Sequence, residues 1–181
     1  MAVWMTRRTC LALVLALAAL GVAVGAVETL RITPVTRDKQ VLVSFELDDA
    51  YDESVRDAIA SGLRTTFTYE LELRTVVPTW IDRTIATTSV ATSDRYDNLM
   101  RRHTLTRTVD GRVEKVLVTE NEAVVREWLT KWTLVPLCDT SKLDPTRDYY
   151  VRITTHARPF GDSLFSWTRG ITNQARFTFV P

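Results

Sequence analysis

The chain has 181 residues, of which 25% are charged and 45% hydrophobic, with a formal net charge of +1. Acidic and basic residues alternate along it instead of forming blocks. Nucleic acids and anionic membrane surfaces both need a clustered basic face, so the charge pattern argues against either as the main partner. The length is right for one domain that buries about two thirds of its extended-chain surface.

The first 26 residues have the anatomy of a cleaved export signal. Arg7 and Arg8 form a basic start, Cys10–Val24 is an apolar run rich in Leu and Ala, and Val24-Gly25-Ala26 closes it with small residues. Because about fifteen apolar residues fall short of the roughly twenty that span a bilayer, cleavage is favoured over retention as a membrane anchor, which stays the alternative. We therefore expect one mature domain, residues 27–181, in the periplasm or outside the cell.

Cleavage leaves 155 residues with 21 basic and 22 acidic side chains, and so a formal charge of −1. Cys138 is then the only cysteine, which excludes a disulfide inside the domain. We interpret Cys138, beside Leu137, as a small buried hydrophobe, with a reactive or intermolecular thiol as the alternative.

Apolar and polar residues alternate with a period of two along most of the mature chain, which predicts antiparallel strands with one wet face. Strands are expected at Val41–Leu47, Phe67–Leu73, Tyr149–Ala157 and Ala175–Phe179. The second of these is the longest run, and it stops at Pro78, which cannot donate to a central ladder. Asp110-Gly111, between Leu105 and Val118, supplies the positive φ angles of a type I′ turn and predicts a hairpin.

Two segments break this pattern and take a helical period. In the first, which runs from Ser54 to Leu63, Ser54 and Asp57 resemble a capping box at the start. Gly62 marks the exit toward the long strand, because glycine readily takes the positive φ angle at which many helices end.

The second helix is better marked than the first. Thr119 and Glu122 form a capping box, in which the threonine hydroxyl accepts one free amide and the glutamate reaches back to another. Apolar residues, among them Trp128 and Trp132, then follow one face of the helix before Pro136. We interpret these two tryptophans as core packing, with a ligand platform as the alternative.

Together the elements predict an α+β fold: a single domain built mainly of antiparallel β-sheet with long strands, with two helices packed on one face. The loosest segments are Asp139–Arg147 and Gly161–Gly170. The second segment holds three large apolar residues that look exposed, Leu164, Phe165 and Trp167. Such residues in a loop either cap the core or anchor a partner.

The order of several segments resembles a known family. An export signal and a strand are followed by Ala58-Ile59-Ala60-Ser61-Gly62-Leu63, Phe67-Thr68-Tyr69 and Arg95-Tyr96-Asp97-Asn98-Leu99, and then by a tryptophan-bearing helix and a late tyrosine-rich strand. This order resembles the bacterial family called domain of unknown function 4390, over most of the mature chain. The resemblance implies a small exported protein without an established activity, and it transfers no catalytic residue. Through genes that neighbour a membrane sensor kinase of the nitrogen-regulation type in some bacteria, it also implies an envelope role by association.

No residue cluster has the spacing of a known catalytic or metal site. Cys138, His103 and His156, together with many serines, are the candidates for a nucleophile and its base, but no serine has the glycine pattern of a nucleophile elbow. Both histidines lie in strand-like runs on the same parity as polar neighbours, so we interpret them as solvated. His-x-x-x-His and Cys-x-x-Cys spacings are absent, as are glycine-rich phosphate loops. We therefore expect no catalytic residue, no metal ligand and no cofactor, with a hydrolase as a remote alternative.

The sequence favours a non-enzymatic accessory or binding protein of the bacterial envelope. One expected partner is an envelope or membrane protein, such as the extracytoplasmic part of a sensor, engaged through a strand edge or through Phe160–Trp167. The alternative is an apolar small molecule or lipid between the strands and the helices, lined by Trp128, Trp132, Tyr69 and Phe67. Membrane contact is expected only through an uncleaved signal, and no nucleic acid is expected. The candidate contact residues are Trp128, Trp132, Leu164, Phe165 and Trp167.

Overall fold

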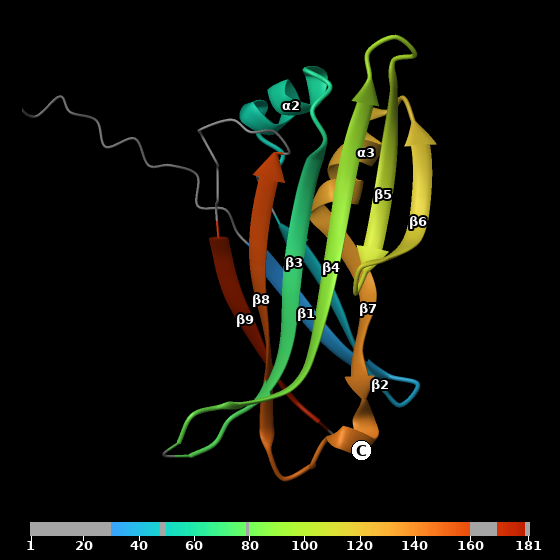
Figure 1. Cartoon of the computed structure of the whole chain (residues 1–181). Helices are drawn as coiled ribbons and strands as arrows, with labels where there is room; N and C mark the ends of the chain where they lie inside the picture. Colours follow the sequence, from blue (N-terminus) through green and yellow to red (C-terminus); the bar gives the residue numbers. More distant parts are fainter. Residues whose placement is uncertain (1–29, 48–49, 79, 160–169, 180–181) are drawn as a thin grey trace, which may run out of the picture.

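The computed structural model describes residues 30–47, 50–78, 80–159 and 170–179 (Figure 1). These form, in chain order, β1 (Leu30–Arg37), β2 (Gln40–Leu47), α2 (Glu53–Ala60), β3 (Thr65–Thr75), β4 (Arg83–Asp97), β5 (Arg102–Val109), β6 (Arg112–Thr119), α3 (Glu122–Thr130), β7 (Lys131–Asp139), the 3₁₀ helix η1 (Thr140–Lys142), β8 (Asp148–Pro159) and β9 (Gly170–Thr178). The predicted α+β class, a single domain of long antiparallel strands with two helices, is confirmed for this part of the chain.

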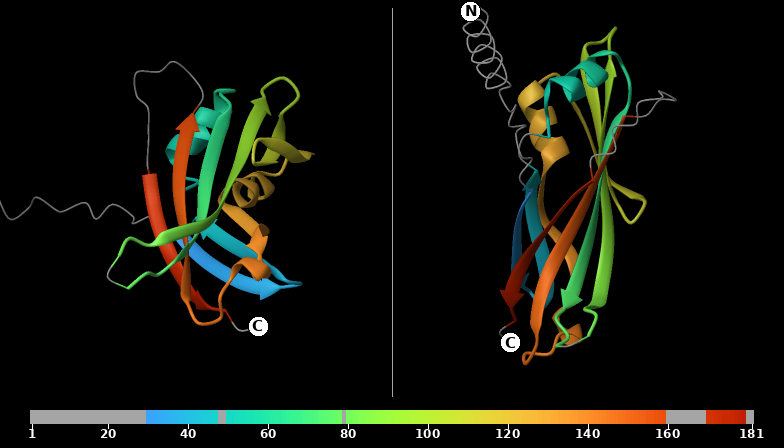
Figure 2. Two further views of the ribbon diagram at one scale, coloured as in Figure 1. Left: turned by 60° about the horizontal axis from the view of Figure 1, so that its bottom comes forward. Right: turned by 90° about the vertical axis from the view of Figure 1, so that its left-hand side faces the viewer.

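The strands divide into two antiparallel sheets, where the sequence predicted one. The larger sheet has the order β6-β5-β4-β3-β8-β9, and the smaller has the order β1-β2-β7. Figure 2 shows the smaller sheet on one face of the larger, with the helices α2 and α3 at the other end of that face. The second sheet arises because β2 pairs with β1 and β7 instead of joining the long strands. The apolar face of the long strands is therefore covered by a sheet along one half and by helices along the other.

The central strand of the larger sheet is β3, which pairs with β4 on one side and β8 on the other. Along Phe67–Leu73 the apolar residues are buried and Glu70 is exposed, as the period of two predicted. The ring centroid of Tyr69 lies 4.8 Å from that of Phe45 in β2, so the core lies between the two sheets. The other predicted strands also fall within or overlap β2, β8 and β9.

The longest strand, β4, has 15 residues and is absent from the strands predicted above. Its buried positions include Thr88, Val90, Thr92 and Asp94, so its inward face lacks the apolar run that marks a half-buried strand. Thr92 tolerates burial because its hydroxyl donates to the carbonyl oxygen of Trp128 in α3, at 3.2 Å. A strand that contributes polar groups to the interior cannot be found by apolar alternation alone.

Both glycine-containing turns that the sequence singled out are confirmed. Asp110 and Gly111 join β5 to β6 with φ angles of 47° and 77°, the positive pair that a type I′ turn needs. Gly62 follows α2 with a φ angle of 80°. A side chain at Gly62 would also be tight, because a Cβ atom there would lie 3.3 Å from Nδ2 of Asn98.

Both helices begin at caps other than those predicted. The cap of α2 is Asp52, whose carboxylate accepts a first-turn N–H at 2.9 Å, and Ser54 only donates its hydroxyl to that carboxylate. The cap of α3 is Asn121, whose side-chain oxygen accepts a first-turn N–H at 2.9 Å, two residues after Thr119. The predicted caps were wrong because two short polar residues stood near each start, and the spacing to a later acidic residue favoured the wrong one.

The residue Trp132 lies in β7 and not on the second helix. Lys131 already has extended backbone, with φ of −125° and ψ of 134°. Buried residues then recur in β7 at Trp132, Val135 and Leu137. The helical assignment of Trp132 was wrong because a spacing of four from Trp128 also arises across a junction between a helix and a strand.

The predicted export signal, residues 1–26, lies outside the described residues. Within the described ranges, no helix is both long enough and apolar enough to cross a membrane. The predicted contact residues of the late loop, Leu164, Phe165 and Trp167, also lie outside the described residues, so their role stays a prediction.

Candidate functional site

The tryptophans predicted as candidate contacts, Trp128 and Trp132, are only 6% and 4% exposed. The guanidinium carbon of Arg107, in β5, lies 4.4 Å from the ring centroid of Trp128 and 4.6 Å from that of Trp132. Phe45 stacks on Trp132 with centroids 6.4 Å apart, and Nζ of Lys115 lies 5.5 Å from the Trp128 ring. The interpretation of the two tryptophans as core packing is confirmed, because protein side chains cover their rings.

The guanidinium of Arg107 also joins three elements through hydrogen bonds. Its Nη2 donates to the carbonyl oxygens of Trp128, at 3.1 Å, and Lys131, at 2.5 Å. These carbonyls end α3, where the helix dipole is negative and a cation is favoured. Burial lowers the pKa of Arg107, but a guanidinium stays protonated in proteins. The contact therefore fixes the junction between α3 and β7 against β5.

Two further residues expected to line a ligand cavity, Tyr69 and Phe67, are fully buried. The hydroxyl of Tyr69 donates to the carbonyl oxygen of Leu129 at 2.8 Å, and burial raises the pKa of this tyrosine. Together with Phe45, which contacts both Tyr69 and Trp132, these side chains fill the space between β3, β2 and the α3–β7 junction.

Asp94 and His103 form a buried hydrogen-bonded pair that the sequence did not predict. Nδ1 of His103 lies 2.8 Å from Oδ2 of Asp94, across the pairing of β4 and β5. Both side chains are on the inward face of the sheet. The interpretation of His103 as solvated was wrong, because it shares its parity with the buried Leu105. Burial raises the pKa of Asp94, and the hydrogen bond with His103 partly opposes that rise.

Aromatic and acidic side chains from β4, from the segment before α2 and from α3 lie near this pair. The ring of Tyr96 lies 4.5 Å from that of His103. The hydroxyl of Tyr51, in the segment before α2, donates to Oε1 of Glu122 in α3 at 3.4 Å. Burial, and then the carboxylates of Glu122 and Asp94, raise the pKa of Tyr51 to about 12. Titratable side chains with shifted pKa values that lie this close together are typical of functional sites and also of structural ion pairs.

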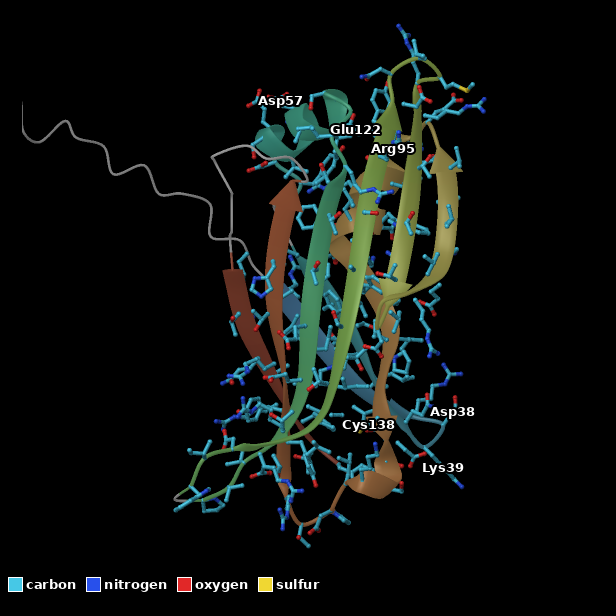
Figure 3. The ribbon with its side chains drawn as sticks, viewed as in Figure 1. Asp38, Lys39, Asp57, Arg95, Glu122 and Cys138 are labelled. Atoms are coloured by element: carbon cyan, nitrogen blue, oxygen red, sulfur yellow. The ribbon has the colours of Figure 1, made fainter. Side chains whose placement is uncertain are left out.

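In the part of the chain that the structure describes, neither Cys138 nor His156 lies beside the Asp94–His103 pair. An aspartate can orient a histidine as a general base, but Cys138 lies at the opposite end of the molecule from Arg95, the neighbour of Asp94 (Figure 3). His156 faces outward on β8, opposite Thr68. Among the described residues, no three His, Cys, Asp or Glu side chains are grouped so that they could hold a metal ion. The fold therefore does not bring the catalytic candidates of the sequence together.

The side chain of Cys138 itself is half-buried in β7 and packs against the core, as expected for a small hydrophobe. Burial raises the pKa of its thiol. Because the thiolate is the reactive form of cysteine, a raised pKa makes this side chain less reactive at neutral pH.

We expect the contribution of Asp94 to stability to fall as pH rises. Its pKa is higher in the folded protein than the ordinary value of 3.8. The folded protein therefore holds the proton more tightly than the unfolded chain does, and this advantage is lost as pH rises through the folded pKa. Denaturant titrations from about pH 3 to about pH 7 should show the wild type losing unfolding free energy relative to Asp94→Asn as pH increases.

The matched variant is Asp97→Asn, for which we expect a pH dependence of the unfolding free energy opposite to that of Asp94→Asn. The backbone N–H groups of Met100 and Leu99 lower the pKa of Asp97 from 3.8. The stabilisation that the Asp97 carboxylate gives to the fold is therefore complete above pH 3.8 and is lost as pH falls through the folded pKa. The wild type should gain unfolding free energy relative to Asp97→Asn as pH rises. Slopes of the same sign for the two variants would contradict the assignment of Asp94 as a carboxyl group destabilised by burial.

The loop between β3 and β4 exposes two large apolar side chains, which the sequence reading passed over. Trp80 and Ile81 are 79% and 78% exposed. Figure 1 shows this loop projecting from the end of the molecule opposite α2. The available signal was a pair of large apolar residues between Pro78 and Asp82, where a tight turn leaves no room to bury them.

This loop is held in shape by Asp82. The Asp82 carboxylate accepts the N–H of Val77 at 3.2 Å and the hydroxyl of Tyr150 at 2.8 Å, and its carbonyl oxygen accepts from Arg74 at 2.8 Å. The N–H of Trp80 donates to the carbonyl oxygen of Val77 at 3.2 Å. Burial and the contact with Asp82 raise the pKa of Tyr150 to about 12, so its hydroxyl stays a donor at neutral pH.

Comparison with known proteins identifies a family and no individual relative. No curated protein and no solved structure matches the chain. The family model called Domain of unknown function (DUF4390) matches residues 25–158, from before β1 to the end of β8. The segments 58–63 and 95–99, which carried the resemblance in the sequence, lie within this range. Because the match spans most of the chain, the protein belongs to the family of the domain of unknown function 4390.

Proposed function

We propose that this protein is an exported, non-enzymatic accessory protein of the bacterial envelope that binds another envelope protein through the loop between β3 and β4. The observation that carries the proposal is the exposure of Trp80 and Ile81 side by side in that loop. Adjacent large apolar side chains in solvent are costly and mark contact surfaces. Tryptophan is also enriched among the residues that dominate binding energy at protein interfaces.

The hydrogen bonds around Asp82 support a binding role for this loop. They connect it to β8 through Tyr150 and to β3 through Arg74. Residues that hydrogen bonds already hold in place lose little conformational entropy when a partner binds, so more of the contact energy appears as affinity. The extracytoplasmic part of a membrane sensor kinase is the partner class to test first, because the resemblance implies genes that neighbour such a kinase in some bacteria.

The two alternatives have less support. A carrier of an apolar molecule needs inward residues that leave a cavity, but the four residues proposed as its lining are buried against other side chains: Phe67, Tyr69, Trp128 and Trp132. A hydrolase needs a nucleophile near a base, and the described residues place none of the sequence candidates beside the Asp94–His103 pair.

Export requires processing at the start of the chain, and we predict a mature N-terminus at Val27. The basic start, the short apolar run and the small residues at Val24-Gly25-Ala26 motivate this site. Mass spectrometry of the protein recovered from the envelope fraction measures it. A full-length chain that remains in the membrane fraction would show that the apolar run is an anchor.

The binding role predicts a crosslink that depends on Trp80. Benzoylphenylalanine placed at Ile81 should yield one discrete crosslinked species when intact envelopes are irradiated. Trp80→Ala should abolish this species and leave the melting temperature unchanged, because the side chain is mostly in solvent.

The matched control for this experiment is Val113→Ala in β6, which also truncates a largely exposed apolar side chain. It should leave both the crosslink and the melting temperature unchanged. If Trp80→Ala retains the crosslinked species, or lowers the melting temperature as a core variant would, the loop is not the binding surface.

A further inference from the structure

Two of the segments that carry the family resemblance, residues 58–63 and 95–99, meet in space. The turn after α2 contains Gly62, and the hairpin that joins β4 to β5 contains Asn98. A Cβ atom at Gly62 would lie 3.3 Å from Nδ2 of Asn98 and 3.9 Å from the carbonyl oxygen of Tyr96, so the turn and the hairpin are in direct contact. Residues 58–63 and 95–99 therefore lie against each other, and Leu63, Arg64 and residues 95–102 form one composite surface at this end of the molecule.

The hairpin presents apolar side chains to solvent in a fixed shape. A single carboxylate oxygen of Asp97 accepts the N–H of Leu99 at 2.9 Å and that of Met100 at 3.0 Å, which closes the turn. Leu99 is 97% exposed and Met100 is 68% exposed, and the neighbouring Leu63 is 43% exposed. Nothing in their own hairpin covers these side chains, so the fold bears the cost of exposing them.

Arginines gather around these apolar residues. The surface carries four exposed arginines from three segments of the chain: Arg64, Arg95, Arg101 and Arg102. Among the acidic residues beside them, Asp97 closes the hairpin turn and Glu120 pairs with Arg102 at 3.0 Å. Figure 3 shows Arg95 on the side of the hairpin and Asp57 of α2 on the other side of this end. The four arginines outnumber Asp97 and Glu120, so the surface carries a net positive charge.

We propose that this composite surface, formed by Leu63, Arg64 and residues 95–102, docks on an anionic phospholipid membrane. Leu99 and Met100 project from a convex turn, which suits insertion among lipid chains because a fluid surface needs no complementary pocket. The arginines then contact phosphate groups with their planar, multiple donors. The alternation of charge along the sequence argued against such a partner, but the fold brings Arg64 beside the three arginines of the β4–β5 hairpin.

Membrane docking concerns a different end of the molecule from the Trp80 loop. It rests on the proposed export only in that an exported protein meets a membrane surface. Binding to purified lipid therefore tests it separately from the proposed protein partner.

Vesicle cosedimentation of the exported protein tests the docking surface. The protein should sediment with vesicles of phosphatidylcholine mixed with phosphatidylglycerol, more weakly as salt is added, and not with vesicles of phosphatidylcholine alone. The double variant Leu99→Ser and Met100→Ser should weaken binding by about tenfold or more. Arg101→Glu should do the same by about tenfold, because it replaces an attractive charge with a repulsive one.

Two controls match these variants elsewhere on the surface. Val116→Ser and Arg112→Glu change exposed residues of β6, and they should leave vesicle binding unchanged. Thermal melting of every variant establishes that the fold is intact. Trp80→Ala should also leave vesicle binding unchanged. A failure of the membrane-docking proposal can therefore be told apart from a failure of the proposed protein binding through the Trp80 loop.

Several outcomes would overturn membrane docking. These are an absence of binding to anionic vesicles, equal binding to neutral ones, or full binding by the folded double variant. If the protein does not bind lipid vesicles but a crosslinker at Leu99 captures an envelope protein, this surface belongs to a protein partner instead.

Discussion

Leu71→Asp is expected to abolish stable folding. Leu71 is fully buried at the centre of β3, between Thr88 of β4 and Ile153 of β8. An aspartate there must either bury a charge or take up a proton, and either costs several kcal/mol. A whole domain has only about 5 to 15 kcal/mol of unfolding free energy. Thermal melting or denaturant titration should show no cooperative transition, or one shifted far toward lower stability.

The matched control is Glu70→Lys, one residue earlier on the exposed face of β3. It should change the unfolding free energy by no more than about 0.5 kcal/mol. Glu72 has the same parity but is unsuitable, because its Oε2 accepts from Arg152 at 2.6 and 2.8 Å and lies 3.5 Å from Arg74. If Leu71→Asp and Glu70→Lys lower stability equally, the register of β3 is wrong.

The second large loss of stability is expected for Arg107→Ala. This variant should lower the unfolding free energy by about 3–5 kcal/mol. It removes the guanidinium from the rings of Trp128 and Trp132. It also leaves the carbonyl oxygens of Trp128 and Lys131 without the donor that they share. Chemical denaturation measures the loss, and near-ultraviolet circular dichroism should report the changed surroundings of the tryptophans.

Two further variants separate the causes of that loss. Arg107→Lys keeps a charge but not the planar group that stacks on the rings, so its stability should lie between those of the wild type and the alanine variant. Arg112→Ala, at an exposed position in β6, should be nearly silent. A wild-type stability for Arg107→Ala would mean that the tryptophans pack without the cation.

The parts of the fold that were predictable are those with one apolar face. Phe67–Leu73 in β3 alternates strictly, Val41–Leu47 in β2 alternates except at Leu42, and both bury the expected side chains. The Asp110-Gly111 turn was predictable because few residues accept positive φ angles. The second sheet was not predictable, because the alternation of apolar and polar residues shows which face of a strand is buried but not which other strand it pairs with.

The Asp94–His103 pair shows why the polar interior escaped prediction. Asp94 lies in a strand whose buried positions are Thr88, Val90, Thr92 and Asp94 itself, so β4 lacks the apolar alternation of a half-buried strand. The parity of His103 with Leu105 was readable, but its partner lies nine residues earlier in another strand. A contact of that kind depends on strand register, which one sequence does not define.

The length of β4 sets the distance between the two proposed binding surfaces. This strand runs from just after the Trp80 loop to the hairpin that carries Leu99, so the two tips lie at its opposite ends (Figure 1). At about 3.3 Å per residue, they are about 45 Å apart. The field of lipid headgroups decays over about 8 Å at physiological ionic strength. A molecule standing upright on its arginine-bearing tip would therefore hold Trp80 beyond the reach of the bilayer's charge, and any partner that meets it must itself extend that far from the membrane.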